Sequence, residues 1–285
     1  MATLCIFNPE HDLCLANGDA NYVPPRSALE FACRDASLMQ VLYPCADLCC
    51  SAYDLASKSE IRDTRIEKVI AWGWDAVVKH ELKKRGVSET LLPTDDYIDT
   101  IRRLQHRSTI LPLQPDCRPA VNEADVKSLL RDYKDLVMKA PWSGAGRGLR
   151  WVRGELTAID CDWLKKTVAS QQAVIVEPRR EVQADVALEY TDGQFIGYSY
   201  FKTGGGVYRE NVKMTDDAIE NTFRHTQLKE TRTQVERWLA ENIWTRYHGP
   251  LGVDLMVCKW GKVHVAEMNL RHTMGMVAHV KNNRL

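Results

Sequence analysis

The stretch that decides the fold runs from Val253 to Arg271, VDLMVCKWGKVHVAEMNLR, in a chain of 285 residues. Two short apolar runs flank residues 259–262 (KWGK), a polar link with glycine at the place where a β-hairpin turns. Residues two apart in a strand point to one face of a sheet. The pattern therefore predicts a hairpin on which Glu267 and Asn269 project together, with Asp254 beside them.

Two carboxylates and an amide oxygen on one face form a set of hard oxygen ligands. Such a set suits Mg²⁺, which keeps part of its shell for water and substrate phosphates. Arg271 follows on the same face, where a guanidinium can bind a phosphate or a carboxylate. The alternative is that these side chains are simply solvated on a half-exposed hairpin.

Composition places the chain among globular proteins and gives no sign of a nucleic-acid or membrane role. Apolar residues make up 45 % and charged residues 27 % of the sequence, and the formal net charge is zero. The start, MATLCIFNPEHD, lacks the basic and apolar regions of a signal peptide, so we expect a cytoplasmic protein. An odd count of nine cysteines favours reduced thiols. Cys45, Cys49 and Cys50 lie close together, but no second Cys/His pair has zinc spacing.

The first 110 residues predict a small α/β domain with a mostly parallel sheet. A short strand at residues 3–7 leads into a long polar connection, residues 8–25, which we expect to be ordered. Ligands gather beyond the carboxyl ends of parallel strands. We therefore expect Asn8, Glu10, His11 and Asp12 at a ligand-binding edge, where they could orient an amine or take its proton. The alternative is a turn braced by hydrogen bonds among these side chains.

A second motif combines a lysine with a glycine-rich loop. Prolines mark residues 111–119 as a linker, and a strand at residues 136–140 then carries Lys139 into the loop SGAGRG, residues 143–148. Glycines let backbone N–H groups approach phosphate oxygens, and the lysine adds a positive charge. The spacing matches neither a P-loop nor a dinucleotide fingerprint, so a plain hairpin turn is the alternative.

The remaining chain alternates strands and helices up to the hairpin. A strand at residues 173–176 ends at Glu177, and two strands at residues 185–190 and 195–200 pair through a turn. A second glycine run follows Lys202, and a long helix at residues 227–247 precedes the hairpin.

This order of parts resembles the ATP-grasp superfamily: a strand lysine, a glycine-rich loop, a strand ending in Glu with an acid eight residues on, and a strand Asp followed by E-x-N. The resemblance covers essentially the whole chain. It implies an α/β plus α+β fold, with an N-terminal pre-ATP-grasp domain at residues 1–110. It further implies a small ATP-grasp lobe at residues 111–178 and a large lobe with the metal site at residues 179–285.

The resemblance also implies roles for individual residues. Asp254, Glu267 and Asn269 would hold Mg²⁺, or alternatively Mn²⁺, on the phosphates of ATP, and Arg271 and Lys139 would serve catalysis. The ATP contacts that it implies are Lys139, Ser143, Gly144, Gly146, Arg147, Gly148, Glu177 on the adenine side and Asp185 on the ribose side. A further basic residue ahead of the small lobe would be Arg103 or Arg107.

The function that follows is an ATP-dependent ligase that joins a small carboxylate to an amine, or to another nucleophile such as a thiol, through an acyl-phosphate. The two substrates stay unidentified, and their expected contacts are Asn8, His11, Asp12 and Lys202. The alternatives are a kinase-like member that stops at phosphoryl transfer and a protein that binds nucleotide without turnover. No nucleic-acid or membrane partner is expected, and a homodimer is left open.

Overall fold

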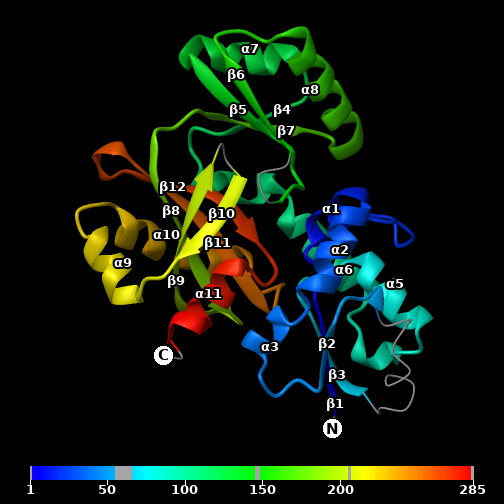
Figure 1. The fold of residues 1–285 in the computed structure, drawn as a ribbon. Helices are drawn as coiled ribbons and strands as arrows, with labels where there is room; N and C mark the ends of the chain where they lie inside the picture. The colour runs from blue at the N-terminus through cyan, green and yellow to red at the C-terminus, as the bar shows by residue number, and fades with distance from the viewer. Residues whose placement is uncertain (1, 55–65, 145–147, 205–206, 284–285) are drawn as a thin grey trace.

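The computed structural model describes residues 2–54, 66–144, 148–204 and 207–283. Within that part of the chain the strands form three sheets, which Figure 1 shows in three separate regions of the molecule. The mixture of one parallel and two antiparallel sheets confirms the predicted α/β plus α+β class. The predicted loop residues Gly146 and Arg147 lie outside the described residues.

The first sheet is parallel, with the order β2-β1-β3. Its central strand carries apolar residues that are fully covered, such as Cys5 and Ile6, as expected for a strand between two helical layers. Asp75 begins the following helix by accepting a hydrogen bond from the Val78 backbone N–H at 2.9 Å. The elements of this part are β1 (Ala2–Ile6), α1 (His11–Asn17), α2 (Arg26–Arg34), α3 (Leu38–Leu42), β2 (Leu48–Cys50), β3 (Ile66–Ala71), α5 (Ala76–Lys84), η2 (Glu89–Leu91) and α6 (Asp95–Gln105).

The connection after β1 is ordered, as expected, but the helix α1 within it was not predicted. Its polar residues sit at the start of the helix and are buried, so hydropathy alone did not show a helical face there. α1 ends at Gly18, whose φ of 80° is the left-handed conformation that commonly ends helices.

The four-stranded sheet is antiparallel and has the order β4-β7-β5-β6. Both of its helices begin with a capping box, formed by Asn122 with Asp125 and by Thr157 with Asp160. The predicted linker is partly wrong, because η3 (Arg107–Leu113) and Gln114 pack on the third sheet, with the Gln114 amide donating to the Val265 carbonyl at 2.9 Å. The elements are β4 (Arg118–Ala120), α7 (Glu123–Asp132), β5 (Asp135–Lys139), β6 (Leu149–Arg153), α8 (Ala158–Gln171) and β7 (Val174–Pro178).

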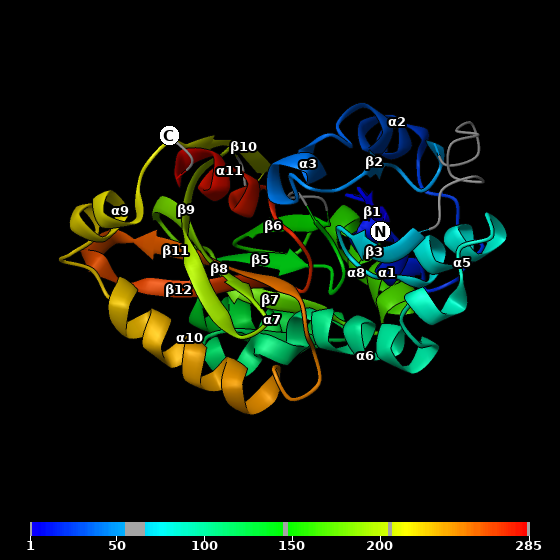
Figure 2. The same ribbon diagram turned by 90° about the horizontal axis from the view of Figure 1, so that it is seen from below.

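The third sheet is five-stranded, with the order β10-β9-β8-β11-β12. One face is apolar and packs on α10, and Figure 2 shows α10 along that side with α11 on the other. The predicted hairpin is present, and its turn is η4 (Lys259–Gly261). The elements are β8 (Val182–Thr191), β9 (Gln194–Gly204), β10 (Val207–Val212), α9 (Asp216–Thr222), α10 (Leu228–Asn242), β11 (Pro250–Cys258), β12 (Val263–Asn269) and α11 (Met274–Asn283).

The predicted boundaries at residues 110 and 178 remain proposals. Each sheet does lie within one of the three predicted ranges. The core beneath the five-stranded sheet, however, also includes Leu15, Ile101, Ile110 and Trp142 from the two earlier ranges. The three parts therefore share apolar contacts and pack as neighbours, beyond being joined by the chain.

The close packing of α11 on the five-stranded sheet gives a stability prediction. A Cβ atom at Gly275 would lie 2.0 Å from Glu189 Oε1 and 2.2 Å from Ser199 Oγ. Gly275→Ala should therefore lower the free energy of unfolding by about 1–3 kcal/mol, although alanine is normally the better helix former. Thermal or urea unfolding measures this change, and an equal or higher stability would contradict the packing described.

Candidate active site

The predicted hairpin acquires its polar face through a β-bulge. Asp254 pairs with Glu267 and Leu255 pairs with Val265, so Ala266 is an extra residue on β12. The extra residue lets Val265 and Met268, three positions apart, both enter the apolar core. It thereby leaves Glu267 on the opposite face, next to Asp254.

Asn269 completes the predicted metal-binding group. Its side-chain amide donates to Asp254 Oδ2 at 3.3 Å, and its amide oxygen accepts from the Arg271 guanidinium at 3.0 Å. Among the described residues there is no cluster of three or more His, Cys, Asp or Glu side chains arranged for a metal. The candidate metal site therefore consists of two carboxylates and one amide oxygen.

The electrostatics of this group suit a cation. Desolvation, followed by the negative charges of Glu267 and Glu189, raises the pKa of Asp254 from 3.8 to about 8. Hard oxygen donors that repel one another in this way fit Mg²⁺, whose charge would favour the ionised carboxylates. The residues present thus fit the metal that the resemblance implies.

Arg107 links this group to the small lobe. The residue is buried, and its Nε donates to the Ala140 carbonyl at 3.0 Å. Its Nη2 donates to the Ser143 carbonyl at 3.0 Å and to Glu267 Oε1 at 2.8 Å. Of the two predicted basic candidates, the structure brings Arg107 to the site, whereas Arg103 donates to Thr100 on the exposed side of α6.

Lys139 and Glu177 lie together on adjacent strands of the small lobe. The Lys139 ammonium is 2.7 Å from Glu177 Oε1, and their side chains are only 10 % and 6 % exposed. Glu177 Oε2 also lies 3.9 Å from the thiol of Cys117, which can donate to it. The two predicted ATP contacts therefore form one buried ion pair at the junction between the small and large lobes.

The other predicted nucleotide and substrate contacts lie at different depths. Asp185 accepts from the Thr203 hydroxyl at 2.6 Å, and burial raises its pKa although the charge of Lys139 opposes that shift. Lys202 is exposed and pairs with Glu210 at 3.0 Å. Asp185 therefore faces the same region as Lys139, whereas the contacts of Lys202 hold it on the outer strands.

The described end of the glycine-rich loop touches the N-terminal domain. A Cβ atom at Gly144 would lie 2.2 Å from Asp12 Oδ2, so only glycine fits there without a shift. Ser143 is buried, and Gly148 has a φ of 75°, which also favours glycine. Asp12 on α1 is thus in direct contact with a loop predicted to bind phosphate.

Asp12 also binds Arg271. The Arg271 Nη2 donates to Asp12 Oδ2 at 2.9 Å, and Nε lies 3.4 Å from Oδ1. Burial alone would raise the pKa of Asp12, but the charge and hydrogen bond of Arg271, together with the charges of His11 and Arg107, lower it below the usual value. All three parts of the molecule therefore meet around Asp12, Gly144 and Arg271.

Asn8 and His11 are buried beside Asp12 and bind Asp75. The Asn8 amide donates to Asp75 Oδ2 at 3.0 Å, and His11 Nδ1 lies 3.1 Å from the same oxygen. These contacts are of the bracing kind that we considered as an alternative for this loop. They leave the other ring nitrogen of His11 without a partner in the described structure.

Glu189 is a polar residue of the site that the sequence analysis missed. It is fully buried, and it accepts from the Ser199 hydroxyl at 2.9 Å and the Thr273 hydroxyl at 2.8 Å. Burial raises its pKa to about 7. Its position four residues after Asp185 in a strand of alternating pattern was the signal that could have identified it.

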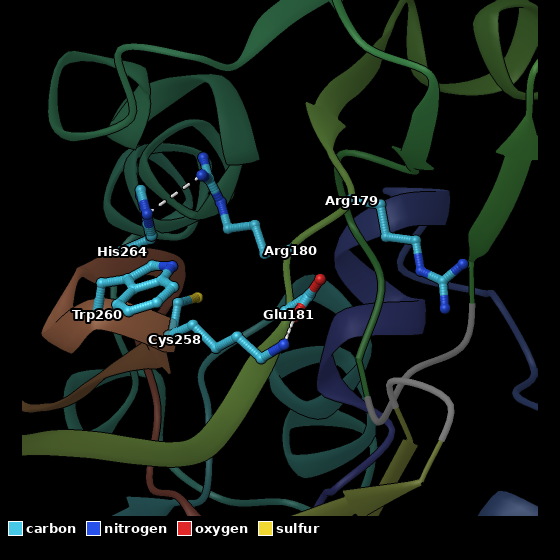
Figure 3. A pocket seen from close by; sticks show the side chains of 7 residues that line it. Arg179, Arg180, Glu181, Cys258, Trp260 and His264 are labelled. Atoms are coloured by element: carbon cyan, nitrogen blue, oxygen red, sulfur yellow. Dashed lines mark hydrogen bonds and ion pairs between the residues drawn. The ribbon is translucent and has the colours of Figure 1, made fainter.

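A surface cavity of about 410 Å³ lies where β7 crosses to β8 beside the hairpin turn. In Figure 3, Arg180 points toward His264, with Arg180 Nη1 and His264 Nε2 3.2 Å apart, while Arg179 points away from them. Two of the residues that line the cavity, Arg179 and Arg180, follow Glu177 closely in the sequence. Its lining residues are Arg179, Arg180, Glu181, Cys258, Lys259, Trp260 and His264.

Comparison with known proteins finds likeness in structure but not in sequence. No family profile and no curated protein matches the chain. The solved structure of D-cycloserine synthetase DcsG aligns with a TM-score of 0.58 and 14 % identity, covering 99 % of both chains. N5-carboxyaminoimidazole synthetase from Staphylococcus aureus, complexed with ADP, aligns with a TM-score of 0.55 and 13 % identity over 95 % of this chain and 71 % of that one.

A third similar structure carries the name of the superfamily. The ATP-grasp ligase PsnB, complexed with a minimal precursor, aligns with a TM-score of 0.52 and 10 % identity over 99 % of this chain and 97 % of that one. The chain therefore has the ATP-grasp fold, and the predicted resemblance is confirmed at that level. Separately, none of the described helices combines the length and apolar character that crossing a bilayer requires.

The raised pKa of Asp254 gives a prediction about stability and pH. The folded protein keeps the proton of Asp254 up to about pH 8, whereas the unfolded chain releases it near 3.8. The stability of the metal-free protein should therefore fall as pH rises between these values. Asp254→Asn should melt a few degrees higher than wild type at pH 9, with little difference at pH 4.

Thermal melts of the two proteins from pH 4 to 9, without metal or nucleotide, measure this difference in melting temperature. Glu10 and Glu189 titrate in both proteins, so the difference between the two melts isolates Asp254. A difference in melting temperature that does not change with pH, or a variant that is less stable at pH 9, would contradict the conclusion that burial and nearby carboxylates disfavour the ionised form of Asp254.

Proposed function

We propose that the protein is a Mg–ATP-dependent, ADP-forming ligase that joins a small carboxylate to an amine or another nucleophile. The observation that carries this proposal is the convergence of the carboxylates Asp254 and Glu267 with the cations Arg107 and Arg271. Phosphoryl transfer requires mainly positioning and charge neutralisation. The ATP-grasp fold, and the names of the similar ligases, support this reaction class.

In the proposed reaction a substrate carboxylate oxygen attacks the γ-phosphorus of ATP, and ADP leaves. The acceptor then attacks the acyl carbon, and inorganic phosphate leaves. A bound Mg²⁺ would neutralise phosphate charge, and Asp254, Glu267 and Asn269 are the residues that would hold it. The chain supplies the remaining positive charge through side chains that are already fixed by packing.

Arg107 is placed to bridge the small lobe and the metal-binding strand. Its contacts to Ala140 and Ser143 hold the start of the glycine-rich loop, and its contact to Glu267 orients that carboxylate. Lys139 would exchange part of its contact with Glu177 for phosphate oxygens, leaving Glu177 available to the adenine side. The two cations come from different parts of the chain, Arg107 from η3 and Lys139 from β5.

Arg271 would bind the transferred phosphate, and Asp12 would hold the Arg271 guanidinium in position for it. The Asp12–Arg271 ion pair fixes the guanidinium while the site is free of substrate. A phosphoryl group at this point would compete with Asp12 for the same N–H donors. Asn8, His11 and Asp12 remain our proposed substrate contacts, and the exposed ion pair of Lys202 makes that residue the weakest member of the set.

The experiment that tests the function is a screen for ADP release with amino acids and small carboxylates, alone and in pairs. A ligase should release ADP and phosphate only when both carboxylate and acceptor are present. A kinase-like enzyme would instead accumulate a phosphorylated product, and a binding protein would release nothing.

Glu267→Gln gives a sharper test of the metal-binding role. The substitution keeps the shape of the side chain and its contact to Arg107 but removes a charged ligand. Turnover should fall by about 100-fold or more, while circular dichroism shows that the fold persists. Glu230→Gln, on the exposed surface of α10, is the matched control. Wild-type turnover in Glu267→Gln would refute the metal assignment.

A further inference from the structure

Three polar atoms at one edge of the parallel sheet are buried and have no hydrogen-bond partner in the described structure. They are Glu10 Oε2, His11 Nε2 and the Tyr53 hydroxyl. Glu10 is 5 % exposed and His11 is fully buried. A buried polar group without a partner is costly, and a native structure keeps one mainly where water or a ligand completes it.

The position of these atoms favours a ligand. β1 leads directly to Glu10 and His11, and the adjacent parallel strand β2 leads to Tyr53. The carboxyl ends of parallel strands are where ligands bind in sheets of this kind. The next residue along α1 is Asp12, which contacts Arg271 and the glycine-rich loop.

His11 and Glu10 offer acceptor atoms. Asp75 Oδ2, which already accepts from Asn8, lies 3.1 Å from His11 Nδ1, so Nδ1 is the protonated nitrogen of this contact; in the neutral imidazole Nε2 then carries a lone pair. Burial, together with the nearby charge of Asp75, raises the pKa of Glu10 to about 8. A cation beside Glu10 would reverse that shift.

Tyr53 lies in the same electrostatic environment. Tyr53 follows β2 by three residues and its hydroxyl is buried, and after desolvation the charges of Cys14, Glu10 and Asp75 raise its pKa. A phenol oxygen can accept as well as donate a hydrogen bond. The three atoms therefore offer three acceptors in a region of negative charge.

We propose that Glu10, His11 and Tyr53 bind the primary ammonium group of the substrate that the enzyme activates. An ammonium group has three N–H donors and one positive charge, which these acceptors match. A protonated amine held in this way cannot act as a nucleophile, so the site anchors the substrate. The activated carboxylate then belongs to an amino acid, an inference that rests on the proposed ligase function.

The first test uses the stability of the protein without ligand. Tyr53→Phe removes a hydroxyl that has no partner, so its melting temperature should equal or exceed that of wild type. Glu10→Gln should behave in the same way. Tyr133→Phe, at the end of α7 in the small lobe, is a control for the chemical change. A clear fall in melting temperature for both site variants would show a structural role and overturn the proposal.

The second test uses matched pairs of carboxylates that differ only in the amine. Alanine and propionate, β-alanine and propionate, and glutamate and glutarate are suitable probes. With Mg–ATP and an acceptor, wild type should prefer the amine-bearing member of at least one pair by about tenfold or more in kcat/KM. Glu10→Gln and Tyr53→Phe should lose that preference, and Tyr133→Phe should keep it. Equal use of both members by wild type would overturn the proposal.

The same probes without nucleotide separate this inference from the proposed function. The amine-bearing probe should raise the melting temperature of wild type more than its partner, and Glu10→Gln should remove that difference. If the difference appears but no probe supports ADP release, the ligase function fails and the ammonium site stands. If ADP release occurs equally with both members, the ligase function stands and the ammonium site fails.

Discussion

The repulsion between carboxylates on one face of a sheet is the constraint on which the rest of the site depends. Asp254 and Glu267 are direct partners across the hairpin, and Glu189 lies close enough to raise the pKa of Asp254. Such an arrangement is unfavourable unless positive charge is brought to it. The opposite face of the same sheet is apolar and packs on α10. The strands therefore cannot change register to separate these carboxylates without exposing the apolar face.

One of the positive charges comes from a part of the chain that is distant in sequence, and the other comes from the end of the hairpin. Arg107 reaches Glu267 from the segment after α6, and Arg271 follows β12 itself. Arg271 in turn binds Asp12, which lies against Gly144. Charge compensation therefore also holds the N-terminal domain and the small lobe against β12, which carries the proposed metal ligands. In this way the same interactions stabilise the arrangement of the three parts and build the candidate site.

Much of the fold follows from local patterns in the sequence. The hairpin turn and the paired strands depend on neighbouring residues, so they could be predicted. The bulge at Ala266 could not, because it reflects a requirement to bury both Val265 and Met268. The helix α1 was missed because its buried residues include His11 and Asp12, whose partners lie far along the chain.

The candidate site likewise contains residues that local patterns indicate and residues that only the tertiary structure shows. Asp254, Glu267 and Asn269 could be proposed as one group because strand periodicity indicates which residues share a face. The contact of Asp12 with Arg271 spans 259 positions in the sequence. Arg107 and Glu189 carry no local motif either, and only the tertiary structure distinguishes Arg107 from Arg103. Long-range ion pairs of this kind are set by packing rather than by spacing.

The most direct test of the central claim is to locate the metal. Crystals grown with Mn²⁺ and an ATP analogue would reveal the ion through its anomalous scattering. The account predicts a peak within bonding distance of Asp254, Glu267 and Asn269 oxygens, with the phosphates of the nucleotide completing its shell. A nucleotide bound elsewhere, or an ion that none of these three residues contacts, would contradict it.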